Sequence, residues 1–382
     1  MRLIKLTCIL IPILLLTACW SKVEIDEQTF IFGIYIDKGE SPGTVKVTIS
    51  SPLPNRMMSG QQAGSGGNSG KPYAVVTKSD DTIPDALRNI QKDLTRRLNF
   101  GHTRIVVVSH DYAEKGINEL LDWMNREPTF HLSAFLVVAP GTAKEITELV
   151  PLYEQFPAEV LRKMILQHSL LSTSVKECLI AHSSKMGFAT DQLLYEVENI
   201  PSENDQTQKW TGIQGITLFR GDKFAGTLGL DESRALTWAI GKIGRQVIST
   251  TWDGGASRAS ILFTQLKTKK HVRMTNEGPR FDIQLIGKGD LVNFKDHEHR
   301  DAKEVNQLIE ELLKKKIEND LAAAIRSSQR AKADVLRLGL LLEWNYPEEW
   351  KKYRQEWDDY YHNRIQIRAS AQIDVKNNSN GT

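Results

Sequence analysis

Cysteine and net charge are both scarce in this chain of 382 residues, and each scarcity excludes a class of protein. There are three cysteines, and Cys8 and Cys19 both lie within the first 19 residues. If that segment is an export signal and Cys19 is modified, Cys178 is left alone. No intramolecular disulfide can then form, so the fold must rely on its hydrophobic core. Cys178 has no neighbouring metal ligands in the sequence, and we interpret it as a packed thiol rather than a nucleophile.

The charges balance almost completely. Lysine and arginine total 49 and aspartate and glutamate total 47, and loss of Arg2 and Lys5 with a signal would leave 47 of each. A nucleic-acid-binding protein needs a clustered basic surface, for which a neutral composition gives no support. We therefore expect no nucleic-acid partner.

Catalytic and cofactor motifs are also missing. The sequence contains neither G-x-S-x-G nor H-E-x-x-H, and the G-x-G that Gly64 and Gly66 begin has Ser69 where the dinucleotide-binding fingerprint needs glycine. The densest group of possible metal ligands is 296–301, Asp-His-Glu-His-Arg-Asp. Adjacent residues point in different directions in helices and strands, so we interpret this segment as a solvated linker. We expect no enzyme activity, no cofactor and no bound metal.

The first 19 residues have the layout of an export signal. Arg2 and Lys5 precede an apolar run over 9–16, which is far short of the roughly 20 residues that span a bilayer. Leu-Thr-Ala stands immediately before Cys19 and looks like a bacterial lipobox, whose cysteine is acylated and becomes the new N-terminus. Two acyl chains hold a protein durably on a membrane, where one does not. An ordinary signal peptide with a chance cysteine is the alternative interpretation.

Strand and helix patterns alternate through the first half of the chain. Apolar runs at 103–108 and 134–139 indicate strands covered on both faces, and an amphipathic helix is predicted between them at 112–124. Residues 151–200 look mostly helical and looped. A helix capped by Asp81 or Thr82 is predicted to end at Gly101, Asp231 is expected to cap a later helix, and an apolar stripe from Val305 to Ile325 predicts a long helix. We predict an α+β or mixed α/β fold with mixed sheets and packed helices. The predicted segments are a signal peptide (1–18), a lipidated tether (19–27), a β-rich region (28–75) to which 210–245 is a candidate addition, an α/β domain (76–200), a linker (201–209) and a C-terminal α+β domain with a long helix (255–376).

Two further groups of residues could form binding sites. His102 and Arg104 precede a predicted strand, where a turn contact is the simpler interpretation and a surface ligand site the alternative. Seven aromatic residues crowd 344–361, and three of them, Trp350, Tyr353 and Trp357, have helical spacing. A helix packed on the last sheet explains them at least as well as a sugar-binding or partner-binding surface does.

The chain resembles the C subunits of spore nutrient germinant receptors, the GerC-type lipoproteins, from the signal to about residue 375. The motifs that carry the likeness are individually weak but specific in their order: Cys19-Trp20, then segments at 101–108, 116–122, 141–146, 212–226, 231–234 and 346–358. Ser21 departs from the aspartate that many members carry there, but the acylated cysteine is retained. The resemblance implies three small mixed α/β domains.

The same resemblance implies a role in the dormant spore. It implies an inner-membrane lipoprotein with N-palmitoyl and S-diacylglycerol groups on Cys19. Such C subunits work beside a polytopic A subunit and a B subunit similar to amino-acid permeases, and all three are needed for germination in response to nutrients. A solute-binding lipoprotein is one alternative, although it predicts two similar lobes and this sequence shows no internal duplication. An envelope hydrolase is the other.

Overall fold

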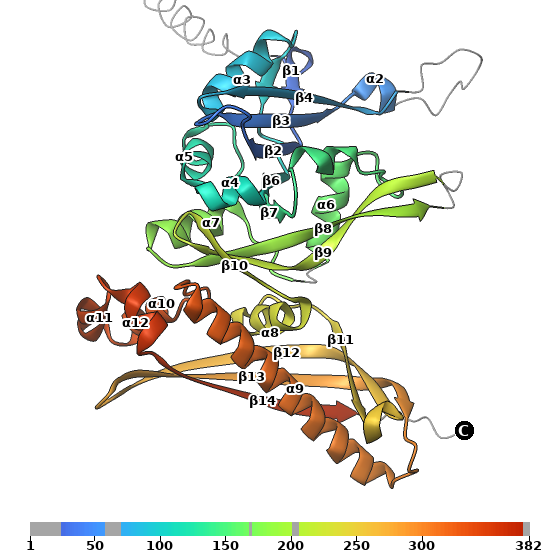
Figure 1. Cartoon of the computed structure of the whole chain (residues 1–382), viewed down its shortest axis with the longest axis vertical. Helices are drawn as coiled ribbons and strands as arrows, with labels where there is room; N and C mark the ends of the chain where they lie inside the picture. The colour runs from blue at the N-terminus through green and yellow to red at the C-terminus, as the bar shows by residue number, and fades with distance from the viewer. Residues whose placement is uncertain (1–23, 58–69, 168–169, 201–205, 377–382) are drawn as a thin grey trace, which may run out of the picture.

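The computed structural model describes residues 24–57, 70–167, 170–200 and 206–376. These residues form two large β-sheets with helices packed on them, one in the upper and one in the lower part of Figure 1. The predicted mixed α+β fold class is confirmed. The predicted signal peptide, Cys19, most of the glycine-rich loop and the C-terminal tail lie outside the described residues.

The upper sheet is mixed and has eight strands. Its order is β10 (Lys223–Leu228), β9 (Gln206–Arg220), β8 (Phe188–Ile200), β7 (Phe135–Ala139), β6 (Ile105–Ser109), β2 (Gly33–Lys38), β3 (Val45–Pro52) and β4 (Tyr73–Asp80). The central pairs from β8 to β2 are parallel, and the outer pairs are antiparallel. Strands from the predicted segments 28–75, 76–200 and 210–245 thus share one sheet. Two further strands, β1 (Gln28–Phe30) and β5 (Arg97–Asn99), pair separately.

Helices cover both faces of this sheet. One apolar cluster packs the sheet against α3 (Ile83–Lys92), α4 (His110–Lys115), α5 (Asn118–Arg126) and α7 (Val175–Ser183). A second cluster on the opposite face includes η2 (Lys144–Glu148) and α6 (Pro157–Leu166). Val106 and Val108 belong to the first cluster, and Ile105 and Val107 to the second. Burial on both faces explains the continuous apolar run of β6, as predicted.

Three predicted helix boundaries were wrong. The helix expected at 112–124 is two helices, α4 and α5, separated at Gly116, whose φ of 114° leaves the right-handed helical region. The helix expected to run to Gly101 is α3, which ends at Lys92, although Thr82 caps it as predicted. Asp231 was expected to cap α8 (Leu230–Ile240), but Gly229 is the N-cap. Asp231 lies in the first turn, where a carboxylate favours the helix dipole.

The region around residue 200 differs most from the prediction. Residues 188–200 were expected to be helix or loop and form β8, and 206–209 of the predicted linker form the start of β9. The two strands pair up to Ile200 and Gln206 and extend beyond the rest of the sheet as a ribbon (Figure 1). Glu196 to Asn199 are exposed in this ribbon, so β8 can carry charged residues near its end without losing its pairing with β9.

The lower sheet has four strands and one long helix. Its order is β11 (Gln246–Trp252), β12 (Ser257–Thr275), β13 (Gly278–Lys295) and β14 (Gln366–Lys376), and only the last pair is parallel. Helix α9 (Ala302–Arg330) crosses one face of the sheet, as Figure 1 shows. Its predicted apolar stripe packs into the core through Val305, Ile309, Leu313, Ile317 and Leu321. Three short helices, α10 (Leu338–Asn345), α11 (Pro347–Tyr353) and α12 (Trp357–Asn363), lie between α9 and β14 in the chain.

Candidate functional site

The predicted lipidation site, Cys19, lies outside the described residues, which begin five positions later at Glu24. An extended chain covers at most about 3.5 Å per residue, so Cys19 lies within roughly 18 Å of Glu24. This distance makes the surface around Glu24 the part of the described molecule closest along the chain to the predicted anchor.

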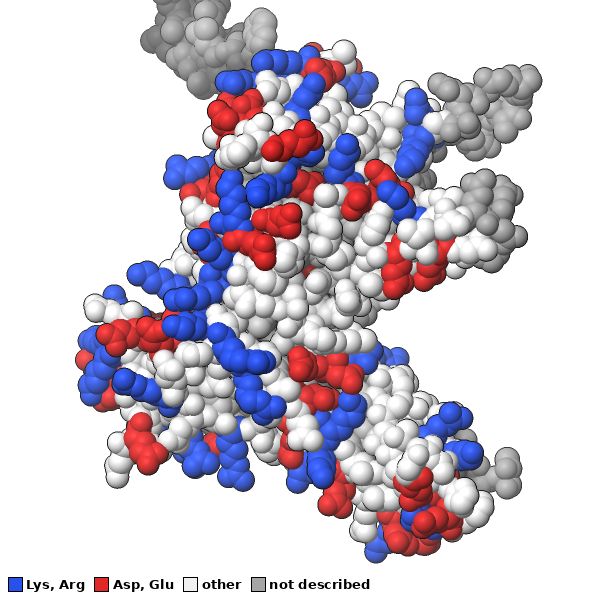
Figure 2. Space-filling model, in the orientation of Figure 1, with Lys and Arg blue, Asp and Glu red and all other residues white. Residues whose placement is uncertain are grey.

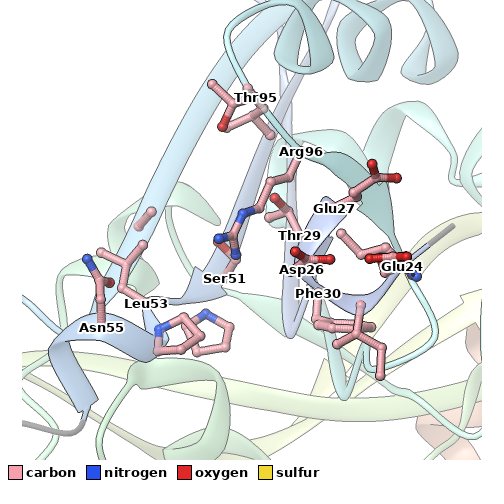
Figure 3. Close-up of a pocket in the computed structure, with 16 residues that line it drawn as sticks. Glu24, Asp26, Glu27, Thr29, Phe30, Ser51, Leu53, Asn55, Thr95 and Arg96 are labelled. Atoms are coloured by element: carbon pink, nitrogen blue, oxygen red, sulfur yellow. Dashed lines mark hydrogen bonds between the residues drawn. The ribbon is translucent and has the colours of Figure 1, made fainter.

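A groove of about 1480 Å³ lies at this surface. It is lined by the short helix η1 (Ile25–Glu27), β1, the end of β3, α2 (Pro54–Met57) and the loop before β5. In Figure 3 the guanidinium of Arg96 extends toward Ser51 and Thr29, and the carboxylates of Glu24 and Asp26 lie to one side. The lining also includes the apolar side chains of Phe30 and Leu53, so the groove offers both charged and apolar surface. In the sequence, Glu24 and Asp26 belong to the predicted tether and give no other signal of a groove.

A smaller pocket of about 280 Å³ lies between α8, β11 and α9. Its wall includes the apolar side chains of Trp238 and Ile317, and Lys316 stands at its rim. The Lys316 ammonium is 2.7 Å from a carboxylate oxygen of Asp231 and 3.1 Å from one of Asp320. The charges at the rim therefore already bind one another.

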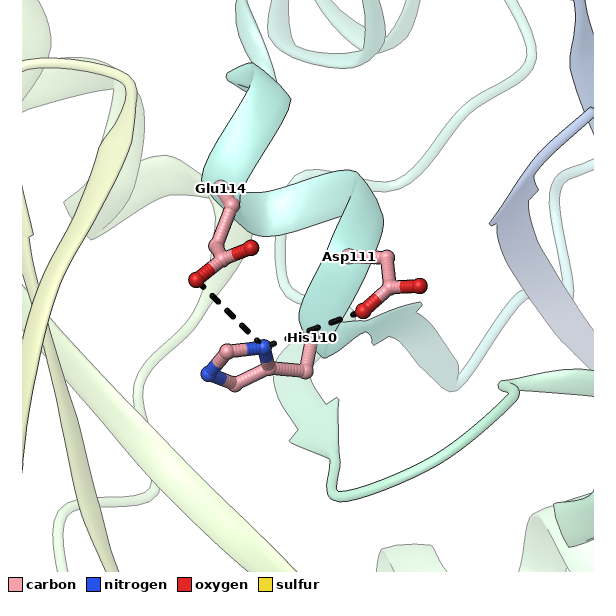
Figure 4. Close-up of side chains that lie close together, drawn as sticks. All are labelled: His110, Asp111 and Glu114. Carbon is pink, nitrogen blue, oxygen red and sulfur yellow. Dashed lines mark ion pairs between the residues drawn. The ribbon is translucent and has the colours of Figure 1, made fainter.

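One group of possible metal ligands among the described residues was missed by the sequence analysis. His110, Asp111 and Glu114 lie on α4, and their ligand atoms are within 4.8 Å of one another (Figure 4). His110 Nδ1 is 4.0 Å from Asp111 Oδ1 and 3.9 Å from Glu114 Oε1, and the imidazole packs on Phe224 at 4.5 Å. Both carboxylates are exposed, so the geometry is that of weak surface ion pairs. The spacing i, i+1, i+4 on a helix was the available sequence signal.

The segment 296–301 was interpreted as a solvated linker. In the structure it contains Arg300, which is surrounded by three carboxylates. The Arg300 guanidinium donates to Asp253 at 2.9 Å, to Asp296 at 2.6 Å and to Glu298 at 2.6 Å. Hydrogen bonds from Arg300 hold the pKa of Asp253 below its usual range. These carboxylates thus fix Arg300 at the turn before α9, and Asp301 caps that helix by accepting from the Lys303 amide.

Two other residues singled out in the sequence have structural surroundings. His102 packs against Phe30 at 4.6 Å and Phe32 at 6.0 Å, which agrees with a contact in a turn before β6. Cys178 is completely buried in α7, and burial raises the pKa of its thiol. A buried neutral thiol is a poor nucleophile, as the sequence analysis expected.

The aromatic segment is mostly core. Trp350 and Trp357 are buried with ring centroids 5.1 Å apart, but they lie on two helices, α11 and α12, rather than on the single helix that their spacing predicted. Trp357 also contacts Phe281 of β13, so these aromatic rings pack on the last sheet. Trp344 of α10 is the exception, with 77% of its surface exposed.

A buried carboxylate, that of Asp334, lies beneath these helices. Asp334 is 1% exposed and accepts hydrogen bonds from the Leu338 amide at 2.9 Å, the Gly339 amide at 2.7 Å and the Trp357 indole at 3.0 Å. Burial raises the pKa of Asp334, and it lowers the pKa of Lys270 to about 8. Lys270 donates to the Leu336 carbonyl at 3.1 Å. This network fixes where α10 begins and where α12 packs.

Two family descriptions match almost the whole chain. Residues 21–187 match "Spore germination protein N-terminal domain", and residues 214–379 match "Spore germination B3/ GerAC like, C-terminal". Of the helices that the structure describes, none is both long enough and apolar enough to cross a membrane.

Similar proteins occur in Bacillus subtilis (strain 168). Spore germination protein KC is 25% identical, with the match covering 96% of this chain and 93% of that protein. Spore germination protein B3 is 24% identical, with 94% and 93% covered. The crystal structure of the GerBC protein superposes with a TM-score of 0.58 at 19% identity, covering 90% of this chain and 97% of that one. At that identity the structural likeness supports the shared fold alone.

Proposed function

Because this chain belongs to the GerC-type family of spore germination proteins, we propose that it is the membrane-anchored C subunit of a spore germinant receptor. In this proposal Cys19 is acylated, residues 19–27 form the tether, and the folded body lies on the outer face of the spore inner membrane. The observation that carries the proposal is the match of both family domains, in order, over residues 21–187 and 214–379.

The body would act by binding membrane subunits rather than by catalysis. The partners proposed from the family resemblance are a polytopic A-type subunit and a permease-like B-type subunit. The geometry supports a binding role. The charged groups at the α8 pocket and around Arg300 already bind one another, Cys178 is buried, and the groove beside Glu24 is open and lined by both charged and apolar side chains.

The proposed division into domains extends the predicted C-terminal unit, 255–376, back to β11 and redraws the rest. The segments 28–75, 76–200 and 210–228 contribute to one sheet, and β11 at 246–252 pairs with β12. We propose one unit around the eight-stranded sheet and one around the four-stranded sheet. These units have unlike topologies, whereas a solute-binding lipoprotein would be expected to have two similar lobes.

The anchoring part is tested by replacing Cys19 with alanine. Cys19→Ala should release the protein from the spore membrane fraction and impair nutrient-triggered germination, because no acyl chain can then be attached. Cys8→Ala is the matched control, since that cysteine lies within the predicted signal, and it should behave as the unaltered protein does. Normal membrane retention and normal germination of Cys19→Ala spores would contradict the anchoring role.

The receptor part is tested by identifying neighbours. The protein is crosslinked in spore membranes, captured after gentle solubilisation, and its partners are identified by mass spectrometry. Recovery of a polytopic subunit together with a permease-like subunit is the expected result. Recovery of transporter components alone would favour a solute-binding protein, and degradation of peptidoglycan by the purified protein would favour an envelope hydrolase.

A further inference from the structure

The four-stranded sheet has one covered face and one open face. The residues of β12, β13 and β14 that belong to the core alternate along each strand, for example Phe281, Ile283 and Leu285, and they pack with α8, α9 and the short helices. Successive side chains of a strand point to opposite faces, so the residues between them point away from those helices. This open face lies on the side of the sheet turned away from α9.

The open face is strongly basic. Its nine cationic residues are Arg258, Lys267, Lys269 and Arg273 on β12, Arg280, Lys288 and Lys295 on β13, and Arg368 and Lys376 on β14. Its acidic residues are Asp282 and Asp290 on β13 and Asp374 on β14. The face therefore carries six more positive than negative charges, although the chain as a whole is nearly neutral. Basic side chains have been gathered here from three separate stretches of sequence.

The ion pairs on this face leave part of the charge uncompensated. Asp282 binds Arg273 and also lies 3.9 Å from Arg280, and Asp374 lies 3.0 Å from Lys288. Among the described residues, Lys267, Lys269 and Arg368 have no ion-pair partner.

Like charges also face one another on this surface. Arg273 and Arg280 are direct cross-strand partners, an arrangement that destabilises a sheet. By contrast, Lys314, Lys315 and Glu311 stand close together on the exposed side of α9, and acidic and basic side chains are intermingled on that side of the molecule (Figure 2). The open face is thus distinguished by charge segregation, which folding alone does not require.

We propose that this open basic face lies against an anionic phospholipid surface and orients the tethered body on its membrane. The inference rests on the membrane attachment in the proposed function, since the tether brings the body within reach of lipid headgroups. The eleven paired residues of β13 and β14 make a face roughly 35 Å long. Cations spread over a broad sheet face complement a surface of phosphates, whereas a single acidic peptide would need a groove. Basic clusters of this size are attracted to anionic leaflets over about a Debye length.

The test maps which lysines the membrane covers. The acylated protein is reconstituted into vesicles of phosphatidylcholine alone or with phosphatidylglycerol, and lysine acetylation rates are measured by mass spectrometry. With phosphatidylglycerol, Lys267, Lys269 and Lys288 should react at least about threefold more slowly, and about 0.5 M salt should restore their rates because it screens the attraction. Lys314 and Lys315 on α9 are the internal control and should react equally in both vesicles.

Charge-reversal variants distinguish binding through the basic face from non-specific adsorption of the protein to the vesicles. Lys267→Glu/Lys269→Glu should abolish the protection of Lys288, and Lys314→Glu/Lys315→Glu should leave it unchanged. The proposal is overturned if rates are equal in the two vesicles, if both lysine sets are protected alike, or if protection persists in the reversed variant. Protection that arises only with added membrane subunits or nucleic acid would also overturn it, in favour of that partner.

Failure of the Cys19 anchor can be distinguished from failure of the basic face to bind lipid. The mass of the purified protein shows whether Cys19 is acylated, and an unmodified Cys19 contradicts the tether. The same labelling with vesicles added to the unmodified protein then tests the face by itself, and equal rates with neutral and anionic vesicles would overturn the proposal there as well.

Discussion

Removal of the Asp334 carboxylate should destabilise the C-terminal unit by about 3 kcal/mol. Asp334→Ala leaves three buried donors, the Leu338 and Gly339 amides and the Trp357 indole, without their acceptor. Each unsatisfied buried donor costs about 1–3 kcal/mol. The lower end applies because burial raises the pKa of Asp334, so that its removal also relieves the cost of holding a buried carboxylate.

The isosteric variant Asp334→Asn shows how much of this destabilisation comes from the loss of single hydrogen bonds. In Asp334→Asn the amide oxygen can occupy the position of Oδ2, which accepts from Gly339 and Trp357, while the amide nitrogen then faces the Leu338 amide. One bond of three is lost, and we expect a cost of about 1–2 kcal/mol. Asp359→Ala is the control. That carboxylate is exposed and paired with Lys332, so its loss should change the free energy of unfolding far less than the loss of the Asp334 carboxylate does.

The assay is equilibrium unfolding in urea, followed by tryptophan fluorescence, because the Trp357 indole itself reports on the site. We expect the free energy of unfolding to be lowest for Asp334→Ala, intermediate for Asp334→Asn and highest for the wild type. If Asp334→Ala were within 1 kcal/mol of the wild type, or if Asn were as costly as Ala, the three hydrogen bonds would not stabilise this region as argued.

Three further outcomes are expected. Trp357→Ala should cost about 3–5 kcal/mol in the same unfolding assay and Trp344→Ala less than about 0.5, because Trp357 is buried and Trp344 is 77% exposed; similar costs would contradict the assigned burial. Burial lowers the pKa of Lys270 from 10.5 to about 8, so the unfolded state binds more protons between these values, and this residue's contribution to the stability should rise with pH through that window. The free-energy difference between Lys270→Met and the wild type, measured from pH 7 to 10.5, should therefore shift in favour of the wild type by up to about 3 kcal/mol, and a flat difference would show that the ammonium is hydrated. The Cys178 thiol should react with a thiol reagent only after unfolding, since it is fully buried and burial raises its pKa, and rapid labelling of the native protein would contradict this packing.

Local periodicity was sufficient to predict several elements. The stripe from Val305 to Leu321 repeats at helical spacing, and it predicted α9 because a helix that packs on a sheet must present such a stripe. The run at 103–108 predicted β6, since a strand buried on both faces has no polar alternation. The lipobox before Cys19 is likewise local, and acylation remains a prediction from the sequence.

Contacts between distant segments were beyond that reasoning. Residues 206–209 belong to the predicted linker, yet they pair with 196–199 as strands because their backbones bond to one another, while Glu196 to Asn199 keep their side chains in solvent. The groove beside Glu24 requires Arg96 and Asn55, which come from separate elements. Asp334 gave no sequence signal, because its role depends on Trp357 and Lys270 meeting it in the folded core.

The sequence by itself determined the family, the mixed α+β class and the main helices and strands, because these follow from motif order and from the spacing of apolar residues along one segment. Only the tertiary structure decided that three early segments share one sheet and that cations from 258–273, 280–295 and 368–376 form one face. Alternation along a strand gives two faces but does not say which is covered. The packing of α9 decides that, and it leaves the basic face open.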